Sequence, residues 1–313
     1  MSHILQLSPY TPECINSDLE AVAPVIRYWD LGNPQVLPAE LAKDVTVVAT
    51  KGDLGVPPAL MASLPNLKLI SVYGVGYDAI DLNEARRRSI AITTTPDSLT
   101  SAVADMAIAL ILAGSRRLVE GDHFVRAGNW ANGKLGTGFD IRGKTVGIFG
   151  YGRIGKKIAR ILEAFDCNIL YCDLKPDADH PAGFCATLEE LAEKSRVLVI
   201  SAAGGAATRG MVNLNVLSRL GPDGLLINVA RGSIVNQEDL IKALQNGAVG
   251  GACLDVFEQE PNVPEPLVSA KNVILTPHIS SATLETRRHM GEVVIQNIAA
   301  WLEGKPLVTP LQL

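Results

Sequence analysis

The sequence contains neither a cluster of basic residues nor a long apolar segment. Its net charge is −5, and its longest basic run is Arg86-Arg87-Arg88, whereas a protein that binds nucleic acid usually carries a basic patch or stripe. The most apolar stretch, residues 107–114, is far shorter than the roughly 18 residues that identify a membrane-spanning helix. We therefore expect no nucleic-acid partner and no membrane association.

Cysteine is scarce and scattered. The five cysteines are odd in number and form no C-x-x-C pair, which favours reduced thiols over a disulfide framework. Cys167 and Cys172 flank or lie in an expected buried strand, where a thiol acts as a small hydrophobe. The ligand clusters of a zinc site are missing, so we expect no metal.

The N-terminus, MSHILQLSPYTPE, lacks the pattern of a signal peptide, and we expect a cytoplasmic protein.

Length and composition indicate two globular domains. A chain of 313 residues is roughly twice the usual domain length. Up to residue 96, short β-branched runs alternate with helix-like segments such as residues 57–64 and 82–88. The runs are HILQLS, VIRYWD, VTVVAT, KLISVYG and AITTTP. This alternation predicts parallel strands joined by crossover helices.

A second series of expected strands follows a long helical pattern that runs from about Thr100 to Ala127 and contains no strand signal. The series is KTVGIFG, NILYCD, VLVISAA, GLLINVA, VGGACLDVF and NVILTP. These runs are apolar on successive residues, as is typical of strands that helices cover on both faces. One more amphipathic helix is expected over residues 284–303. Both halves of the chain are therefore predicted to be α/β.

A glycine-rich turn lies between the first expected strand of the second series and the helix after it. In GIFGYGRIG, Gly150, Gly152 and Gly155 form a G-x-G-x-x-G pattern. The first glycine permits the tight turn, the second lets the backbone approach a pyrophosphate, and the third lets the helix pack closely on the strand. The free N–H groups of the helix N-terminus attract phosphate. Because the strand and the helix that the motif requires are both present, the turn predicts a dinucleotide site.

An acidic residue ends the next expected strand, NILYCD. Asp173 lies 18 residues beyond Gly155, where a carboxylate accepts hydrogen bonds from the adenosine ribose and disfavours a 2′-phosphate. The residue therefore favours NAD(H). Lys175 leaves NADP(H) open, because its ammonium group could pair with a 2′-phosphate.

Three charged or titratable residues follow later expected strands: Arg231 after LLINVA, Glu260 beyond CLDVF, and His278 after VILTP. Ligands of open α/β sheets bind outside the carboxyl ends of the strands, so the three are expected to converge. A histidine can protonate the oxyanion of a reduced ketone, and a carboxylate beside it keeps it charged. An arginine binds a substrate carboxylate with two hydrogen bonds. Each residue alone could be structural or a solvated charge; together, beside a dinucleotide turn, they favour reduction of a 2-oxo acid.

At these residues the sequence resembles the D-isomer-specific 2-hydroxyacid dehydrogenase family over nearly its whole length. The motifs that carry the resemblance are GIFGYGRIG, LINVARGSIV, LDVFEQEP and LTPHISSAT, together with VYGVGYDAID and TTPDSLTSAVADMAIALIL nearer the N-terminus. EAFDC, EPNVPEPL and ETRRHM are similar to the branch of glyoxylate/hydroxypyruvate and hydroxyphenylpyruvate reductases. Because several independent motifs occur in the same order, the match is far more specific than the glycine turn alone.

The resemblance implies a role for each matching residue. His278 would be the general acid/base, Glu260 its partner and Arg231 the carboxylate binder, while Val75 and Gly76 would offer backbone N–H groups to the substrate. The cofactor site would comprise Thr100, Gly150, Gly152, Arg153, Ile154, Gly155, Asp173, Val229, Ala230, Asp255, His278 and Ser281. The expected activity is NAD(P)H-dependent reduction of a small 2-oxo acid, such as glyoxylate or hydroxypyruvate, to the D-2-hydroxy acid.

The fold implied by the resemblance is α/β, with two Rossmann-like or flavodoxin-like domains, parallel sheets and a cleft between them. A discontinuous substrate domain would comprise residues 1–99 and 284–313, and an NAD(P)-binding Rossmann domain residues 100–283. The helix from Thr100 would help to form a homodimer.

Some residues depart from the family pattern. The proline usual after the fourth strand is missing near Ala203, so the adenine wall is expected to differ. Ser280 stands where glycine is frequent, which would narrow the nicotinamide side of the cleft. Animal glyoxylate reductases carry a tryptophan in addition to the one that Trp130 resembles. The segment NGKLGTGF contains no tryptophan that could correspond to it.

The substrate remains open at this stage. The loops at residues 51–55 and 73–76 are expected to decide among glyoxylate, hydroxypyruvate, 2-ketogluconate and hydroxyphenylpyruvate. The alternative to an enzyme is a nucleotide-sensing, corepressor-like interaction protein on the same scaffold. A phosphoglycerate dehydrogenase is disfavoured because a C-terminal regulatory domain is lacking, and a formate dehydrogenase because its histidine does not pair with glutamate.

Overall fold

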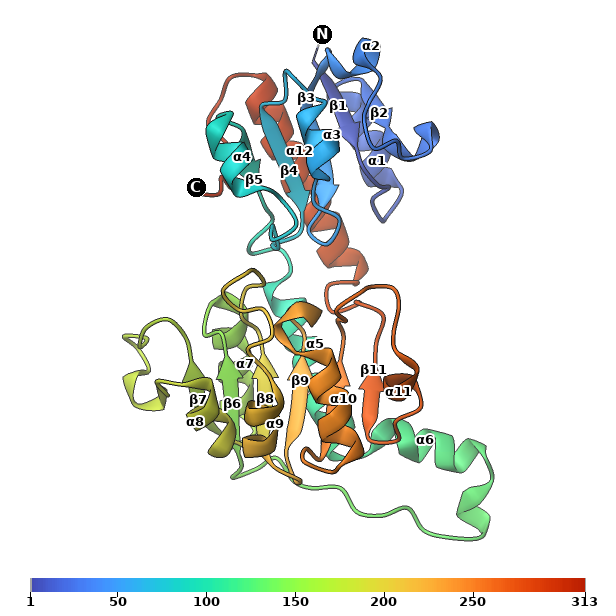
Figure 1. Ribbon diagram of the computed structural model, residues 1–313, viewed down its shortest axis with the longest axis vertical. Coiled ribbons are helices and arrows are strands. Elements are labelled where there is room, and N and C mark those ends of the chain that lie inside the picture. Colours follow the sequence, from blue (N-terminus) through green and yellow to red (C-terminus); the bar gives the residue numbers. More distant parts are fainter. Residues whose placement is uncertain (1, 313) are drawn as a thin grey trace. The chain divides into compact units, whose positions relative to one another are not determined.

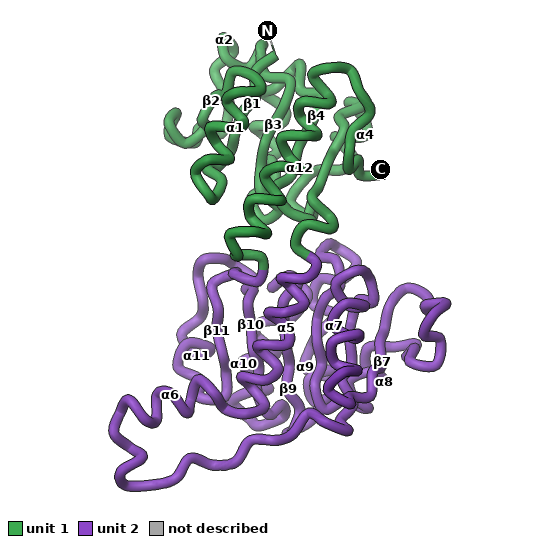
Figure 2. Tube along the Cα trace, turned by 180° about the vertical axis from the view of Figure 1, so that it is seen from behind, with its two compact units in different colours: residues 1–99, 281–313 green, residues 100–280 purple. Residues whose placement is uncertain are grey.

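The chain divides into two compact units in a computed structural model that describes residues 2–312 (Figure 1). Unit 1 comprises residues 1–99 and 281–313, and unit 2 comprises residues 100–280 (Figure 2). The chain therefore leaves unit 1 once and returns to it at Ser281. Among the described residues, no helix is both long enough and apolar enough to cross a membrane.

Unit 1 is built on a parallel sheet with the strand order β2-β1-β3-β4-β5. The strands are β1 (His3–Gln6), β2 (Val25–Arg27), β3 (Val45–Lys51), β4 (Leu69–Tyr73) and β5 (Ala91–Thr93). The helices are α1 (Cys14–Val22), α2 (Ala39–Ala42), α3 (Pro58–Ala62), α4 (Leu82–Arg87) and α12 (Leu284–Leu302). This order is the flavodoxin-like one, and the five strands predicted before residue 96 are confirmed.

The C-terminal helix α12 completes unit 1. It packs against β4 and α1, and it lies beside them in both views (Figures 1 and 2). Gly291 permits this packing, because a Cβ atom there would approach the side chain of Ile15 to 2.6 Å. The segment after α12 also adds to the sheet edge, where Leu311 N donates to the carbonyl of Ile92 at 2.8 Å.

Unit 2 has a parallel sheet with the strand order β11-β10-β9-β8-β6-β7. The strands are β6 (Thr145–Phe149), β7 (Asn168–Cys172), β8 (Val197–Ile200), β9 (Leu225–Asn228), β10 (Gly251–Leu254) and β11 (Val273–Leu275). A single parallel bridge from Tyr171 to Phe184 extends the β7 edge. The chain order reverses between β6 and β8, and ligands of such sheets bind at that switch point.

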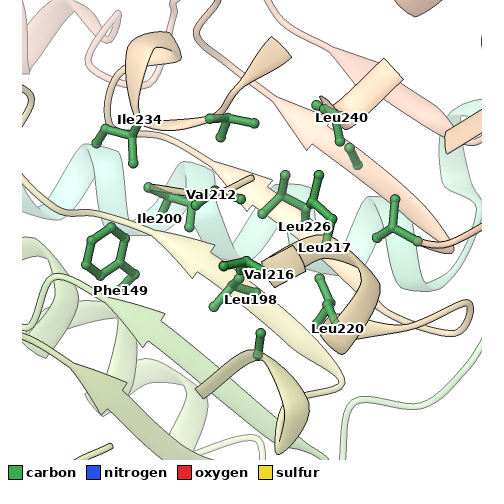
Figure 3. Close-up of a cluster of buried hydrophobic side chains, with 14 of the residues drawn as sticks. Phe149, Leu198, Ile200, Val212, Val216, Leu217, Leu220, Leu226, Ile234 and Leu240 are labelled. Carbon is green, nitrogen blue, oxygen red and sulfur yellow. The ribbon is translucent and has the colours of Figure 1, made fainter. Parts of the chain in front are cut away.

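Helices cover both faces of this second sheet (Figures 1 and 2). One face carries α5 (Thr100–Ser115) and α7 (Arg153–Glu163), which pack against each other. The other carries α8 (Leu188–Glu193), α9 (Leu214–Leu220) and α10 (Gln237–Gln245), while α11 (Glu265–Val268) precedes β11. Side chains such as Leu198, Leu226 and Leu217 are fully buried between strands and helices (Figure 3). The strands are apolar on successive residues because both of their faces are covered.

The predicted single helix over residues 100–127 is wrong in one respect, because it is two helices. The first, α5, ends at Ser115, and α6 begins at Leu118 and ends at Arg126. Arg117 between them has a φ of +53°, a left-handed conformation that a continuous helix cannot contain. Phe139 N donates to the carbonyl of Ser115 at 2.9 Å and so takes up a helix-end acceptor. No proline or other strong helix breaker lies between Ser115 and Leu118, so the break was not predicted from the residue types.

Candidate active site

The glycine turn after β6 adopts a conformation that requires glycine at two of its three positions. Gly150 has a φ of +93°, and a Cβ atom there would lie 2.4 Å from the backbone of Ala202. A Cβ atom on Gly155 would lie 2.2 Å from the carbonyl oxygen of Gly150. At Gly152, by contrast, a Cβ atom would meet nothing within 4 Å. The space outside Gly152 is therefore open to a ligand at the N-terminus of α7, where the N–H groups attract phosphate.

Asp173 connects the end of β7 to this turn. Its carboxylate accepts hydrogen bonds from the backbone N–H groups of Tyr151 and Leu174, both at 2.6 Å. A carboxylate has about four acceptor positions, so capacity remains for the hydroxyls of a ribose. The structure thus places the acidic residue directly beside the glycine turn, as the sites of dinucleotides require.

Arg231 follows β9, the strand adjacent to β10. Its loop lies directly on the chain after β10, because a Cβ atom on Gly232 would come within 2.0 Å of the carbonyl oxygen of Phe257. The side chain of Asn228 holds the loop by donating to the Arg231 carbonyl at 3.0 Å. This contact brings Arg231 close to the segment that carries Glu260.

Glu260 and His278 form an ion pair. Nδ1 of His278 lies 2.7 Å from Oε2 of Glu260, and the backbone N–H of Phe257 donates to Oε1 at 3.0 Å. The side chain of His278 remains 32% exposed and that of Glu260 28%, so the pair is held in place and still accessible. The segments that carry the two residues follow β10 and β11, which are neighbouring strands.

The pair changes the pKa of both partners. The hydrogen bond with Glu260 raises the pKa of His278 above its ordinary value, against the opposing effects of burial and of the Arg231 charge. Burial pushes the pKa of Glu260 up, but the hydrogen bonds from His278 and Phe257 and the positive charges outweigh it, so this pKa lies below its ordinary value. The pair therefore consists of a carboxylate and a histidine that holds its proton to higher pH than a free imidazole does.

Asp255 fixes the turn that presents His278. Its fully buried carboxylate accepts from the Thr276 hydroxyl at 2.6 Å and from Ile279 N and Ser280 N, both at 2.9 Å. Inside this turn His278 has a φ of +51°, an uncommon conformation for histidine that the surrounding hydrogen bonds maintain. Asp255 was predicted to line the cofactor site; its partners in the structure make it a positioning residue, and a cofactor contact stays a prediction.

Ser280 does not point into open space. Its side chain is buried, and its hydroxyl donates to Asp255 at 2.5 Å. Its hydroxyl is therefore committed to Asp255, and a narrower nicotinamide side stays a prediction. A glycine at this position would lack one hydrogen bond to the turn that holds His278.

The other predicted residues occupy loops and helix starts at the carboxyl ends of both sheets. Thr100 begins α5, Arg153 and Ile154 begin α7, and Val229 and Ala230 follow β9 in unit 2. Val75 and Gly76 follow β4 in unit 1, and Ser281 begins the segment that returns to unit 1. Arg287 was not predicted as a site residue, although it lies in ETRRHM; it lines a pocket of unit 1.

Comparison with known proteins adds an independent observation. Residues 108–280 match the family described as D-isomer specific 2-hydroxyacid dehydrogenase, NAD binding domain. The chain is similar to glyoxylate/hydroxypyruvate reductase A from Arabidopsis thaliana (41% identity, 98% of each chain) and to hydroxyphenylpyruvate reductase from Plectranthus scutellarioides (40%, 95% of each). It also resembles the structure of an NADPH-dependent glyoxylate/hydroxypyruvate reductase from Sinorhizobium meliloti in complex with NADP and malonate. The identity to that protein is 40% and the TM-score 0.91, over 99% of this chain and 96% of the other.

Proposed function

Because the chain belongs to the D-isomer-specific 2-hydroxyacid dehydrogenase family, we propose that it reduces glyoxylate, hydroxypyruvate or a related small 2-oxo acid. Its general class is that of an oxidoreductase that interconverts 2-oxo acids and D-2-hydroxy acids with a nicotinamide cofactor. The observation that carries the proposal is the ion pair of His278 and Glu260 at the ends of adjacent strands, with Arg231 after the next strand. This set supplies a proton and a carboxylate-binding group in one place.

Each residue of the set has a distinct task. The nicotinamide cofactor supplies the hydride when it is bound. A carboxylate only accepts hydrogen bonds, so Nδ1 of His278 donates to Glu260 and Nε2 is left to give its proton to the oxygen of the substrate. Arg231 binds the carboxylate of the substrate with its planar guanidinium group. The backbone N–H groups of Val75 and Gly76 are proposed to bind the same carboxylate.

Unit 2 is proposed to hold the cofactor, and unit 1 to contribute the backbone N–H groups of Val75 and Gly76 to substrate binding. The glycine turn fits a dinucleotide because Gly152 leaves open space beside it and Asp173 stands at the end of the next strand. Asp173 supports a preference for NADH, since a buried or partly buried carboxylate repels a 2′-phosphate. Thr100, Arg153, Ile154, Val229, Ala230 and Ser281 are proposed to complete the cofactor site.

We expect the purified protein to oxidise NADH when glyoxylate or hydroxypyruvate is added, and to use NADPH at a kcat/KM at least about tenfold lower, the cost of one unfavourable charge contact. The measurement is the loss of absorbance of each cofactor with both acids, 2-ketogluconate and hydroxyphenylpyruvate. Absence of turnover with every acid would overturn the proposed function. Equal use of both cofactors would overturn the NADH preference only.

The pH profile should depend on Glu260. Reduction needs the protonated form of His278, so kcat/KM is expected to be constant at low pH and to fall as pH rises through the pKa of His278. Because Glu260 raises this pKa above 6.5, the wild-type fall should lie above pH 6.5. In Glu260→Gln the fall should move toward pH 6.5 or lower. Glu258→Gln, an exposed neighbour in the same loop, should leave the profile in place. An unshifted profile in Glu260→Gln would contradict the pairing.

We also infer a homodimer from the arm formed by α6 and the turn at Asn129–Ala131. Leu118, Val125 and Trp130 in this arm are 65%, 54% and 71% exposed. Large apolar side chains that are this exposed on one arm favour a protein interface there. A monomeric mass in light scattering would contradict the inference.

A further inference from the structure

Unit 1 contains a pocket that none of the roles described so far uses. It has a volume of about 380 Å³ and is lined by Thr11, Pro12, Lys51, Tyr73, residues 282–284 and Arg287. A cavity of this size falls within the range of small-molecule sites. Lys51 ends β3 and Tyr73 ends β4, and the two are paired in register. The pocket is therefore at the carboxyl edge of the sheet, where α/β domains bind ligands.

Two cationic side chains, Lys51 and Arg287, face this pocket without a carboxylate partner. Across residues 2–312 neither of them forms an ion pair. Burial, and in addition the charge of Arg287, lowers the pKa of Lys51 despite the opposing charge of Asp53. Lys and Arg are almost never fully buried without a partner, and these two side chains are partly buried. An anionic group that entered the pocket would relieve the repulsion between the two.

Tyr73 connects three parts of the pocket wall. Tyr73 stacks on Tyr10 with ring centroids 4.4 Å apart, and its hydroxyl lies 2.7 Å from the carbonyl oxygens of both Thr11 and Arg287. The guanidinium carbon of Arg287 lies 5.7 Å from the centre of the Tyr73 ring, within the range of a cation–π contact. Arg287 is therefore positioned in advance, which lowers the entropy cost of binding a ligand.

The pocket adjoins the backbone proposed to bind the carboxylate of the substrate. A Cβ atom on Gly52 would lie 2.7 Å from the carbonyl oxygen of Gly76, so the loop that follows Lys51 packs directly on Val75–Gly76. A 2-oxo acid held by those N–H groups would have its distal end near Lys51. Lys51, Arg287 and the Val75–Gly76 backbone all belong to unit 1.

We propose that Lys51 and Arg287 form a distal subsite that selects 2-oxo acids with a second acidic group, a carboxylate or a phosphate, at the end opposite the reacting carbonyl. The proposal rests on the proposed function and names the substrate class of that site. Glyoxylate is too short to reach the subsite, and hydroxypyruvate offers it only a hydroxyl. A dianionic acid would meet two charge-assisted contacts, each stronger than a neutral hydrogen bond.

The test compares two acids of equal chain length, 2-oxoglutarate and 2-oxovalerate, which differ in the distal carboxylate. The readout is the ratio of their kcat/KM values with NADH. We expect the wild-type ratio to favour 2-oxoglutarate by about tenfold or more, and Arg287→Met and Lys51→Met each to lower it by about tenfold, as the loss of one charged hydrogen bond would. Arg288→Met removes an exposed arginine from the same helix turn and should leave the ratio unchanged.

The outcomes separate the two proposals. Turnover of glyoxylate or 2-oxovalerate with a wild-type ratio near one would overturn the subsite and leave the proposed function standing. An equal loss with both acids in Arg287→Met would also overturn it, because a structural defect does not discriminate between them. A further outcome is that the wild type prefers 2-ketogluconate to 2-oxoglutarate and that this preference is lost in both Arg287→Met and Lys51→Met. That result would show a subsite for hydroxyl groups and overturn the proposed preference for a second acidic group. Inactivity toward every 2-oxo acid would overturn both.

Discussion

Replacing His278 by glutamine is expected to lower kcat for the reduction of a 2-oxo acid by about 10²–10⁴, the usual contribution of a general acid. Glutamine has a similar reach and can donate a hydrogen bond, but it cannot release a proton at neutral pH. The dissociation constant of NADH should change by less than about threefold, because the proposed pyrophosphate and ribose contacts are at the glycine turn and Asp173. Steady-state kinetics and a fluorescence titration with NADH provide the two measurements.

His289 offers a matched control for this experiment. It also lies near a glutamate, with Nδ1 3.5 Å from Oε2 of Glu292, but it is exposed on α12. His289→Gln is expected to leave kcat within about twofold, as surface substitutions usually have small effects. Parallel losses of NADH affinity and kcat in His278→Gln would argue that the histidine supports the fold of the site rather than the proton transfer.

Replacing Arg231 by methionine should reduce kcat/KM by roughly a hundred- to a thousandfold, because two charge-assisted hydrogen bonds to the substrate carboxylate are lost together. Arg231→Lys keeps the charge without the planar fork, so it should recover only part of this loss. The measurement is kcat/KM for hydroxypyruvate at fixed NADH in the three proteins.

A second effect distinguishes this role from a purely structural one. Arg231 also lowers the pKa of His278, so the fall of kcat/KM with pH should move to higher pH in Arg231→Met. Arg219→Met removes an arginine that pairs with Glu193 at 2.8 Å on the surface of α9, and it should change neither kcat/KM nor the profile. Full activity in Arg231→Met would exclude Arg231 as the carboxylate binder.

The positions of the strands along the chain and the glycine turn were readable in the sequence because short-range features determine them. Apolar runs bounded by turns predicted β1 to β11, and Gly150 and Gly155 occupy the positions where a Cβ atom would collide with backbone. The break between α5 and α6 was not readable. It depends on the left-handed conformation of Arg117, which no residue type at that point signals.

The sequence by itself determined two α/β halves, the family, and the residues that follow the strands, since parallel strands bring their carboxyl ends to one edge wherever they occur. The family resemblance also implied that Glu260 would be the partner of His278, but only the tertiary structure decided the geometry of that pair and the other contacts of these residues. It made Asp255 and Ser280 supports of the histidine turn. It also brought Arg287 to the pocket of Lys51, from which 236 positions separate it in the sequence. The physical reason is that such contacts depend on strand register and on the return of α12 to unit 1, which involve residues too far apart for a local pattern to encode.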